Sequence, residues 1–399
     1  MKKYKRIFLI VMDSLGIGKA HDADKFGDEG SNTFTHISEK FENGLHIPVL
    51  NNLGIGDLDE IKGTNIVSHP NSFTVRLCEA SNGKDTMTGH REMMGILTTI
   101  PFQTFTDTGF PKELIDELER RTGHKLIGNY AASGTEILKD LGEQCMNENA
   151  LIIYTSSDSV LQLCGHEETM GLNELYRCCE IARELTMKPE WFVGRVIARP
   201  FIGTDKTNFK RTPNRHDYTV SPSGLTAMEI LKDNGITVSC VGKINDIFNG
   251  VGVTETVHTV SNDDGMNKTI EILNSPSFKS GFCFINLVEF DSEFGHRRNP
   301  IGYGKAIEKF DVQLQEFISH MREDDLLLIT ADHGNDPTWK GTDHTRENVP
   351  LLAYSKLISD GKHLKDRYSF ADIGDSILTN FNLSKKDKMI GSTIVELFK

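Results

Sequence analysis

Short apolar runs that stop at an acidic residue recur at three places along the chain. Residues 6–12, 282–290 and 326–330 are each dominated by Ile, Leu, Val and Phe. Continuous apolar runs of this length predict strands that are buried on both faces of a parallel sheet. The carboxyl ends of such strands meet at one edge of an open α/β sheet, where ligands bind. The side chains that follow the runs are therefore the first candidates for function.

Carboxylates and imidazoles gather at these expected strand ends. The six side chains are Asp13, Asp291, His296, Asp332, His333 and His344. Three carboxylates and three imidazoles at one sheet edge suit two divalent cations, and manganese best satisfies a mixture of oxygen and imidazole ligands. A single pair such as Asp332 and His333 has a simpler interpretation, in which the carboxylate caps a helix and the imidazole is solvated. The recurrence of the pattern favours the metal site.

A polar segment at 81–94 follows another expected strand at 73–77 and carries a candidate nucleophile. Gly83 and Asp85 interrupt the chain there, and Thr86 can then begin a helix. A hydroxyl in the first turn of a helix faces unpaired backbone N–H groups, which is a favourable place for a phosphate. Threonine at a helix start is more often only a cap. Beside two cations, however, Thr86 becomes a suitable nucleophile and phosphoryl carrier.

The pattern of expected elements changes between residues 101 and 217, where the expected strands are shorter. The expected elements of this segment are a charged helix at 113–121 and short strands at 151–154 and 192–199. Metal-ligand candidates lie on both sides of this segment, and they can meet only if it is inserted into a single core. We therefore expect an α/β core domain formed by 1–100 and 218–399, and a smaller inserted α+β cap domain formed by 101–217.

Two amphipathic helices are predicted towards the carboxyl end of the chain. Apolar residues recur at helical spacing in 306–321, so we expect this helix to pack on the sheet. A second helix, at 370–378, is expected on the surface. A further strand at 237–241 would place Lys243 just beyond its carboxyl end.

Composition and charge exclude several classes of protein. The formal net charge of −13 disfavours a nucleic-acid surface. Seven cysteines without a C-x-x-C pair indicate reduced thiols, with neither a disulfide scaffold nor a zinc-thiolate site. No apolar run approaches membrane-spanning length, and neither a P-loop nor a G-x-S-x-G motif is present. We expect a cytoplasmic, monomeric enzyme with no membrane or nucleic-acid partner.

Several segments together resemble the alkaline phosphatase superfamily. They are Asp13 after the first strand, Gly83-Lys84-Asp85-Thr86, 286–291 with His296, 330–334 and 342–347. Within this superfamily the chain is closely similar, essentially end to end, to the bacterial phosphopentomutases. The resemblance implies an alkaline-phosphatase-like fold, in which helices sandwich a mostly parallel sheet and a cap is inserted. His90-Arg91 departs from the His-Trp pair of the family, which affects only the packing of that loop.

The resemblance also implies a phosphoryl transfer between C1 and C5 of ribose or 2-deoxyribose, with two bound Mn²⁺ ions. By analogy with the family, Asp13, Asp332 and His333 hold one ion, and Asp291, His296 and His344 hold the other. Thr86 carries the phosphoryl group and gives it to the pentose phosphate, which forms a 1,5-bisphosphate before a phosphate returns. A sugar bisphosphate such as glucose 1,6-bisphosphate or ribose 1,5-bisphosphate would activate the enzyme.

Pentose phosphates are the small-molecule partners that the resemblance implies. Asp158 would accept hydrogen bonds from ribose hydroxyls, and Arg195, Arg211, Lys243 and the backbone of Ile197 would hold the distal phosphate. From the sequence alone, a helix cap explains Asp158 and surface charge explains the two arginines. A cap that closes over the site would keep water from the bisphosphate while it turns over.

Three rival interpretations remain open at the level of the sequence. A metal-dependent phosphomonoesterase or phosphodiesterase on the same fold would release inorganic phosphate, which a mutase would not. A cofactor-independent phosphoglycerate mutase would carry the phosphate on serine, and Thr86 argues against it. A non-catalytic metal- or sugar-phosphate-binding protein would keep its ligands after Thr86→Ala and would have no turnover to lose.

Overall fold

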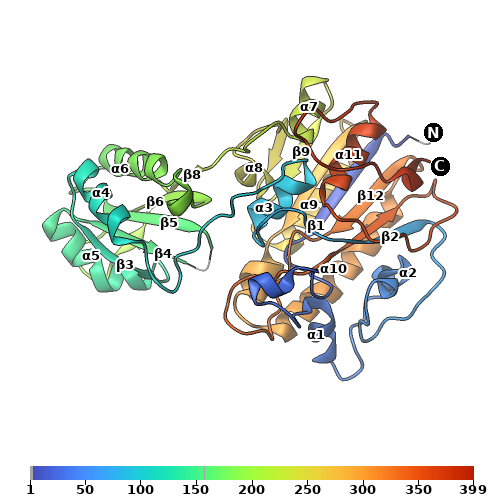
Figure 1. Ribbon diagram of the computed structural model, residues 1–399, viewed down its shortest axis with the longest axis horizontal. Helices are drawn as coiled ribbons and strands as arrows, with labels where there is room; N and C mark the ends of the chain where they lie inside the picture. Colours follow the sequence, from blue (N-terminus) through green and yellow to red (C-terminus); the bar gives the residue numbers. More distant parts are fainter. Residues whose placement is uncertain (1–2, 157) are drawn as a thin grey trace. The chain divides into compact units, whose positions relative to one another are not determined.

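The computed structural model describes residues 3–156 and 158–399 of the chain. These residues form two compact units, which Figure 1 shows coloured along the sequence. Unit 1 combines Met1–Thr99 with Ser221–Lys399, and unit 2 is the intervening Ile100–Val220. The insertion expected at 101–217 lies within unit 2, which extends one residue further at its start and three residues further at its end.

Among the described residues, unit 1 is built on a seven-stranded sheet with the order β10-β9-β11-β1-β12-β13-β2. The strands are β1 (Arg6–Met12), β2 (Ser72–Leu77), β9 (Val238–Val241), β10 (Glu255–Val257), β11 (Gly281–Leu287), β12 (Asp325–Thr330) and β13 (Val349–Tyr354). The neighbours from β10 to β12 run parallel, whereas β13 is antiparallel to both β12 and β2. The mostly parallel sheet predicted from the apolar runs is confirmed.

The central strand β1 is buried along its whole length. Its one charged residue, Arg6, is neutralised by a two-pronged ion pair with Asp325, in which Nε lies 2.7 Å from Oδ1 and Nη2 lies 2.5 Å from Oδ2. The register pairs Met12 with Leu287 of β11 and Val11 with Thr330 of β12. The three strands therefore end at the same edge. The run at 282–290 is strand only to Leu287, because the chain turns into a π-helical segment at Phe290.

The helices of unit 1 form two packed groups. They are α1 (Thr33–Glu39), α2 (Pro48–Asn52), α3 (Thr86–Met93), α7 (Ala227–Asp233), α8 (Ile244–Ile247), α9 (Asn262–Asn274), α10 (Pro300–His320) and α11 (Ala371–Asn380). In one group α10 contacts α1, α2 and α9, and in the other α3 and α7 contact α11 while α8 contacts α3. The long helix α10 begins six residues before the predicted 306, after an Asn299 cap whose side chain accepts from the N–H of Gly302.

The prediction of a surface helix at 370–378 is wrong. Helix α11 is almost entirely buried, including its polar residues Asp372, Ser376 and Asn380. Arg367 pairs with Asp372, and Asn380 exchanges hydrogen bonds with the backbone of Tyr4. Distant parts of the chain thus satisfy side chains that look solvated in the sequence. No helix in the described ranges is both long and apolar enough to cross a membrane.

Unit 2 is a smaller mixed sheet with helices on both faces. Its strands are β3 (Leu126–Ala131), β4 (Leu151–Thr155), β5 (Val160–His166), β6 (Arg195–Ile202), β7 (Lys210–Arg211) and β8 (His216–Thr219), in the order β3-β4-β5-β6-β7 with β8 beside β6. Alternate residues of β4 face two cores: Leu151 and Ile153 join α4 (Lys112–Thr122) and α6 (Leu172–Leu185), whereas Ile152 and Tyr154 join α5 (Glu136–Glu148).

Candidate active site

The first ligand group lies where β1 and β12 end, and all its side chains are fully buried. Oxygen or nitrogen atoms of Asp13, Asp332 and His333 lie within 4.8 Å of one another. Ser14, which follows Asp13, has a left-handed backbone with φ of 71°, and its N–H donates to Oδ1 of Asp332 at 3.0 Å. A strained non-glycine residue that links two candidate ligands is typical of a functional site.

Several atoms that act as hydrogen-bond acceptors face one another in this group. The Nδ1–H of His333 donates to the carbonyl of Gly334 at 3.0 Å, which leaves Nε2 with a lone pair. That Nε2 lies 3.5 Å from Oδ1 of Asp13 and 3.4 Å from Oδ2 of Asp332. Neither oxygen has a hydrogen-bond partner among the described residues. Because buried acceptors without donors are costly, this arrangement fits a cation better than it fits a packed core.

The second ligand group is carried by the segment η4 (Phe290–Gly295), a π-helix that follows β11. Oδ2 of Asp291 lies 3.0 Å from Nε2 of His296 and 3.5 Å from Nε2 of His344. His296 uses its Nδ1–H to donate to the carbonyl of Thr342 at 2.7 Å, so its Nε2 is turned towards the carboxylate. Asp291, His333 and His344 also lie within 4.8 Å of one another, which makes His333 a neighbour of both groups.

The pKa values of Asp13 and Asp291 are shifted in opposite directions. Burial, together with the carboxylates of Asp332 and Asp291, raises the pKa of Asp13 well above its usual range, and the charge of Lys243 only partly offsets this. Burial also opposes ionisation of Asp291, but the imidazoles of His296 and His344 hold its pKa well below the usual range. Burial opposes the ionisation of Asp332 as well, but the imidazoles of His333 and His90 hold its pKa below the usual range. Asp13 is therefore the carboxylate of the site that most lacks positive charge nearby.

Thr86 reaches this cluster from the first turn of α3. The side chain of Asp85 caps the helix by accepting from the N–H of Thr88 at 3.0 Å. A Cβ atom added to Gly89 would lie 2.1 Å from the carbonyl oxygen of Asp332, so only glycine allows α3 to come this close to the end of β12. As a result Oγ1 of Thr86 lies 3.2 Å from Nε2 of His333. The predicted nucleophile Thr86 therefore lies beside the predicted metal ligand His333.

Three buried polar side chains orient the candidate ligands, and sequence reasoning assigned them no role. Asn286 donates to Oδ2 of Asp13 at 2.7 Å, and Asn335 donates to Oδ1 of Asp291 at 2.7 Å. Nδ1 of His90 donates to the carbonyl of Thr86 at 2.9 Å and lies 3.0 Å from Oδ2 of Asp332. A polar Asn286 inside an otherwise apolar strand was the available signal, since a buried amide needs a partner.

A buried ion pair fixes the loop that leads to Thr86. Arg346 lies 2.5 Å from Oε2 of Glu79 and donates to the carbonyls of Glu79 and Gly83 at 2.8 and 2.5 Å. Both side chains are at most 2% exposed. A guanidinium donates hydrogen bonds to several acceptors in a fixed geometry. Arg346 therefore positions the Gly83-Lys84-Asp85-Thr86 segment.

Two of the residues predicted to bind substrate in unit 2, Arg195 and Asp158, form an ion pair with one another. Nη2 of Arg195 lies 3.2 Å from Oδ2 of Asp158, and its Nη1 lies 3.8 Å from Asp217. Ile197 is buried in β6, two residues along the strand from Arg195. Nε of Arg211 is buried and has no hydrogen-bond partner among the described residues. In unit 1, Lys243 is exposed at the start of α8.

Comparisons with known proteins agree with this fold and site. A family model described as the Metalloenzyme superfamily matches residues 5–385. Solved structures of similar fold include the PH0037 protein of Pyrococcus horikoshii and a phosphoglycerate mutase of Leishmania mexicana, each with a TM-score of 0.50. They cover 98% of this chain and 100% and 97% of their own, at 14% and 12% identity. The chain belongs to this alkaline-phosphatase-like superfamily of metalloenzymes.

Relatives at much higher identity narrow the assignment. A phosphopentomutase of Clostridium beijerinckii is 57% identical over 395 residues, and the match covers 99% of both chains. A phosphopentomutase of Agathobacter rectalis is 54% identical over 396 residues, which covers 99% of this chain and 100% of the relative. The chain is therefore an enzyme of the phosphopentomutase family.

Proposed function

We propose that this enzyme interconverts the 1-phosphate and the 5-phosphate of ribose or 2-deoxyribose. The observation that carries the proposal is the hydroxyl of Thr86, held 3.2 Å from an imidazole nitrogen at the meeting point of two ligand groups. The names of relatives that are 54–57% identical over 99% of the chain support a pentose phosphate as the substrate. Threonine rather than serine at this position supports the same class of mutase.

Two Mn²⁺ ions fit the donor set. Asp13, Asp332 and His333 would hold one ion, and Asp291, His296 and His344 the other. Three carboxylates would leave such a dinuclear centre with a small positive charge, which favours a phosphate dianion. When bound, the ions act as Lewis acids that stabilise the Thr86 alkoxide and the charge on phosphorus oxygens. Oxygen and imidazole donors together favour manganese over zinc or magnesium alone.

Thr86 carries the phosphoryl group between the two ends of the sugar. The free hydroxyl of a pentose phosphate attacks phosphorus on phosphorylated Thr86, so the bond from phosphorus to Oγ1 breaks as the new ester bond forms. The proton lost by the sugar hydroxyl returns to Oγ1. The 1,5-bisphosphate then presents its other phosphate, and the reverse transfer releases the isomer. A sugar bisphosphate such as glucose 1,6-bisphosphate would load Thr86 for the first turnover.

Substrate recognition is proposed for side chains outside the ligand groups. Asp158 would accept hydrogen bonds from ribose hydroxyls, and Arg195, Arg211 and the backbone of Ile197 would hold the distal phosphate, with Lys243 as a further cation. Guanidinium groups suit this task because their forked donors match phosphate oxygens. The pair between Arg195 and Asp158 would open as substrate enters.

The decisive experiment follows both products of one substrate. The Mn²⁺-loaded enzyme is incubated with ribose 5-phosphate and a trace of glucose 1,6-bisphosphate, and ribose 1-phosphate and inorganic phosphate are measured together. The proposal expects isomerisation with little phosphate release, and intact mass with peptide mapping should find the phosphate on Thr86. Release of phosphate as the main product would indicate a hydrolase. A phosphate on a peptide without Thr86 would refute the assigned carrier.

A further inference from the structure

Unit 2 contains a third group of side chains that could bind a metal ion, which the proposed mutase reaction does not use. Glu174 and Cys178 lie one turn apart on α6, so both face the same side of the helix. His124 joins them from the loop between α4 and β3. The Nε2 of His124, a carboxylate oxygen of Glu174 and the Sγ of Cys178 lie within 4.8 Å of one another. Cysteine spacing predicted no zinc-thiolate site, but the fold supplies ligands from separate segments.

The hydrogen bonds of His124 turn a nitrogen towards the carboxylate. Its Nδ1 lies 2.9 Å from the carbonyl oxygen of Asn149, a contact that requires a proton on Nδ1. Its Nε2 lies 2.9 Å from Oε1 of Glu174. A neutral imidazole in this tautomer aims a lone pair at the carboxylate, and either a second proton or a metal ion relieves the repulsion. A histidine whose Nδ1–H is bound to a backbone carbonyl is the usual arrangement of an Nε2 metal ligand.

We propose that His124, Glu174 and Cys178 form a binding site for Zn²⁺ with three protein ligands. Tetrahedral zinc holds oxygen and nitrogen ligands ~3.4 Å apart and oxygen and sulfur ligands ~3.6 Å apart, given bonds of ~2.1 Å to O or N and ~2.3 Å to S. The Sγ of Cys178 lies 3.7 Å from Oε1 of Glu174. The pair between His124 and Glu174, at 2.9 Å, must open by roughly 0.5 Å to reach that geometry.

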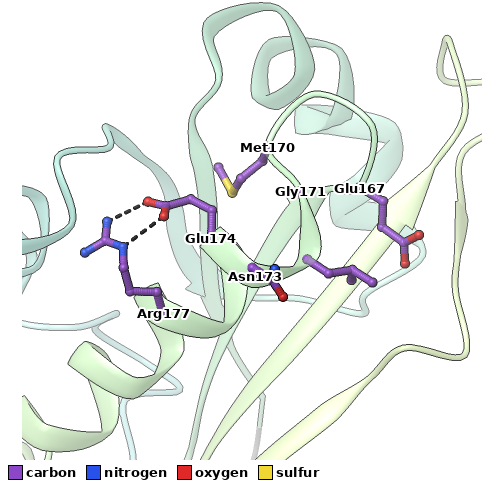
Figure 2. Close-up of a pocket in the computed structure, with 7 residues that line it drawn as sticks. Glu167, Met170, Gly171, Asn173, Glu174 and Arg177 are labelled. Carbon is purple, nitrogen blue, oxygen red and sulfur yellow. Dashed lines mark hydrogen bonds and ion pairs between the residues drawn. The ribbon is translucent and has the colours of Figure 1, made fainter.

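The side chain of Arg177 holds both oxygens of the Glu174 carboxylate, so an ion that binds Oε1 must displace one of these two bonds. Its Nε donates to Oε2 of Glu174 at 2.9 Å and its Nη2 donates to Oε1 at 2.5 Å, and Figure 2 draws both interactions. The same Nη2 also donates to the carbonyl of Thr122 at 2.7 Å. Glu174 and Arg177 also line an open pocket of about 700 Å³, whereas His124 and Cys178 are not among its lining residues. When Oε1 binds the ion, Oε2 keeps its bond to Arg177, and such supporting contacts orient metal ligands in proteins.

Zinc binding here must release the proton of Cys178, because only the thiolate is a strong ligand. Burial and the charge of Glu174 raise the pKa of Cys178 to about 12, so the thiol is protonated before the ion arrives. One proton leaves for each ion that binds. The apparent affinity for Zn²⁺ should therefore rise by about 10-fold for each unit of pH between 6 and 8.

Cobalt is the probe that separates this site from the ligand groups of unit 1. Those groups contain carboxylates and imidazoles only, whereas a thiolate bound to Co²⁺ gives a charge-transfer band in the near ultraviolet. The full-length protein is first loaded with Mn²⁺ and then titrated with Co²⁺. Co²⁺ also replaces Mn²⁺ at carboxylate and imidazole sites, so the thiolate band rather than the total bound Co²⁺ reports on this site. We expect the band to saturate during the titration and to disappear when Zn²⁺ is added.

Variants of two neighbouring cysteines provide the matched test. Cys178→Ala should lose the band, whereas Cys179→Ala, at the adjacent buried position of α6, should keep it. His124→Asn changes a partly exposed side chain and should weaken the band even if Cys178→Ala folds poorly. No band in the wild type, or a band that survives both Cys178→Ala and His124→Asn, would overturn the site. Mutase activity is not the readout, so failure here is independent of the proposed function.

Discussion

The candidate ligand groups of unit 1 and the candidate substrate residues of unit 2 differ in whether their charges already have partners of opposite charge. In unit 1, Asp13 and Asp332 are fully buried and direct oxygens without hydrogen-bond partners towards a lone pair on His333. In unit 2, Arg195 is about one quarter exposed, at 23%, and already pairs with Asp158 and Asp217. The first arrangement is complete only with added positive charge. The second already contains both positive and negative charge, so a ligand must compete with internal ion pairs.

This difference predicts how steeply each region should respond to substitution. A buried set of side chains that requires a cation loses its function when one side chain is removed, because the net charge and the coordination of the ion change together. A partly exposed ion pair can exchange one partner for another at a modest cost. The predictions below therefore run from the nucleophile and ligands of unit 1 to the cap residues and finally to a buried carboxyl that supports the site.

Thr86→Ala should have the largest effect. The hydroxyl that we propose as the phosphoryl carrier is lost while the capping bonds of Asp85 remain, so the fold should be intact. We expect kcat to fall by about 10⁴-fold or more, with binding of Mn²⁺ unchanged. Isomerisation of ribose 5-phosphate and bound manganese are measured on the same sample. Thr86→Ser is the matched control and should retain measurable turnover. Comparable rates for the alanine and serine variants would exclude Thr86 as the carrier.

Asp13→Asn should separate activity from stability. The variant loses a proposed metal ligand, so we expect activity to fall by about 10³-fold and one equivalent of Mn²⁺ to be lost. In the metal-free protein the amide can donate to the acceptors around His333, and it removes a carboxylate whose pKa is raised by burial and by Asp332. The metal-free variant should therefore be more stable than the metal-free wild type, by ~2 kcal/mol.

Urea unfolding with and without Mn²⁺ provides the measurement for Asp13→Asn. Manganese should stabilise the wild type strongly and the variant weakly, since only a protein that binds the ion gains free energy from it. If the metal-free variant is instead less stable than the metal-free wild type, the interpretation of Asp13 as an uncompensated charge is wrong.

Arg195→Met should produce a smaller change that acts mainly on substrate binding. We expect KM for ribose 5-phosphate to rise by about 10- to 100-fold, because a charge-assisted contact to the distal phosphate is lost. Part of that cost is offset, since substrate no longer has to displace Asp158 from the guanidinium. Arg120→Met is a control on the same unit, where an exposed arginine pairs with Glu117 at the surface. Equal effects of the two variants on KM would remove Arg195 from the substrate site.

The sequence predicted strand ends better than it predicted the environment of polar residues. Asp13 and Asp332 could be placed because continuous apolar runs define buried parallel strands, and those strands end at one edge. The supporting contacts of Asn286, Asn335 and His90 could not, because each depends on a partner far away in the sequence. The same limit explains the error at α11, whose buried polar residues meet chain segments that local periodicity does not describe.

A buried carboxyl that supports the site gives the smallest effect on turnover and a distinct dependence on pH. Oε1 of Glu347 accepts from the hydroxyls of Thr33 and Thr345 at 2.7 and 2.6 Å. Its Oε2 accepts from the N–H groups of Thr33 and Gly18 at 2.9 and 3.2 Å. Burial raises the pKa of Glu347 to about 7 from an ordinary value of 4.5. Between these two values the folded protein binds more protons than the unfolded protein does.

Stability contributed by the protonated form of Glu347 is therefore present below pH 4.5 and is lost as pH rises through about 7. The loss amounts to ~3 kcal/mol at pH 8. Glu347→Gln removes this loss, since its amide nitrogen can lie between the two threonine hydroxyls while its oxygen keeps both N–H donors. The free energy of urea unfolding of the variant relative to the wild type should rise by that amount between pH 4.5 and pH 8. Glu323→Gln, at an exposed position, should show no such rise, and a difference for Glu347→Gln that is independent of pH would contradict the prediction.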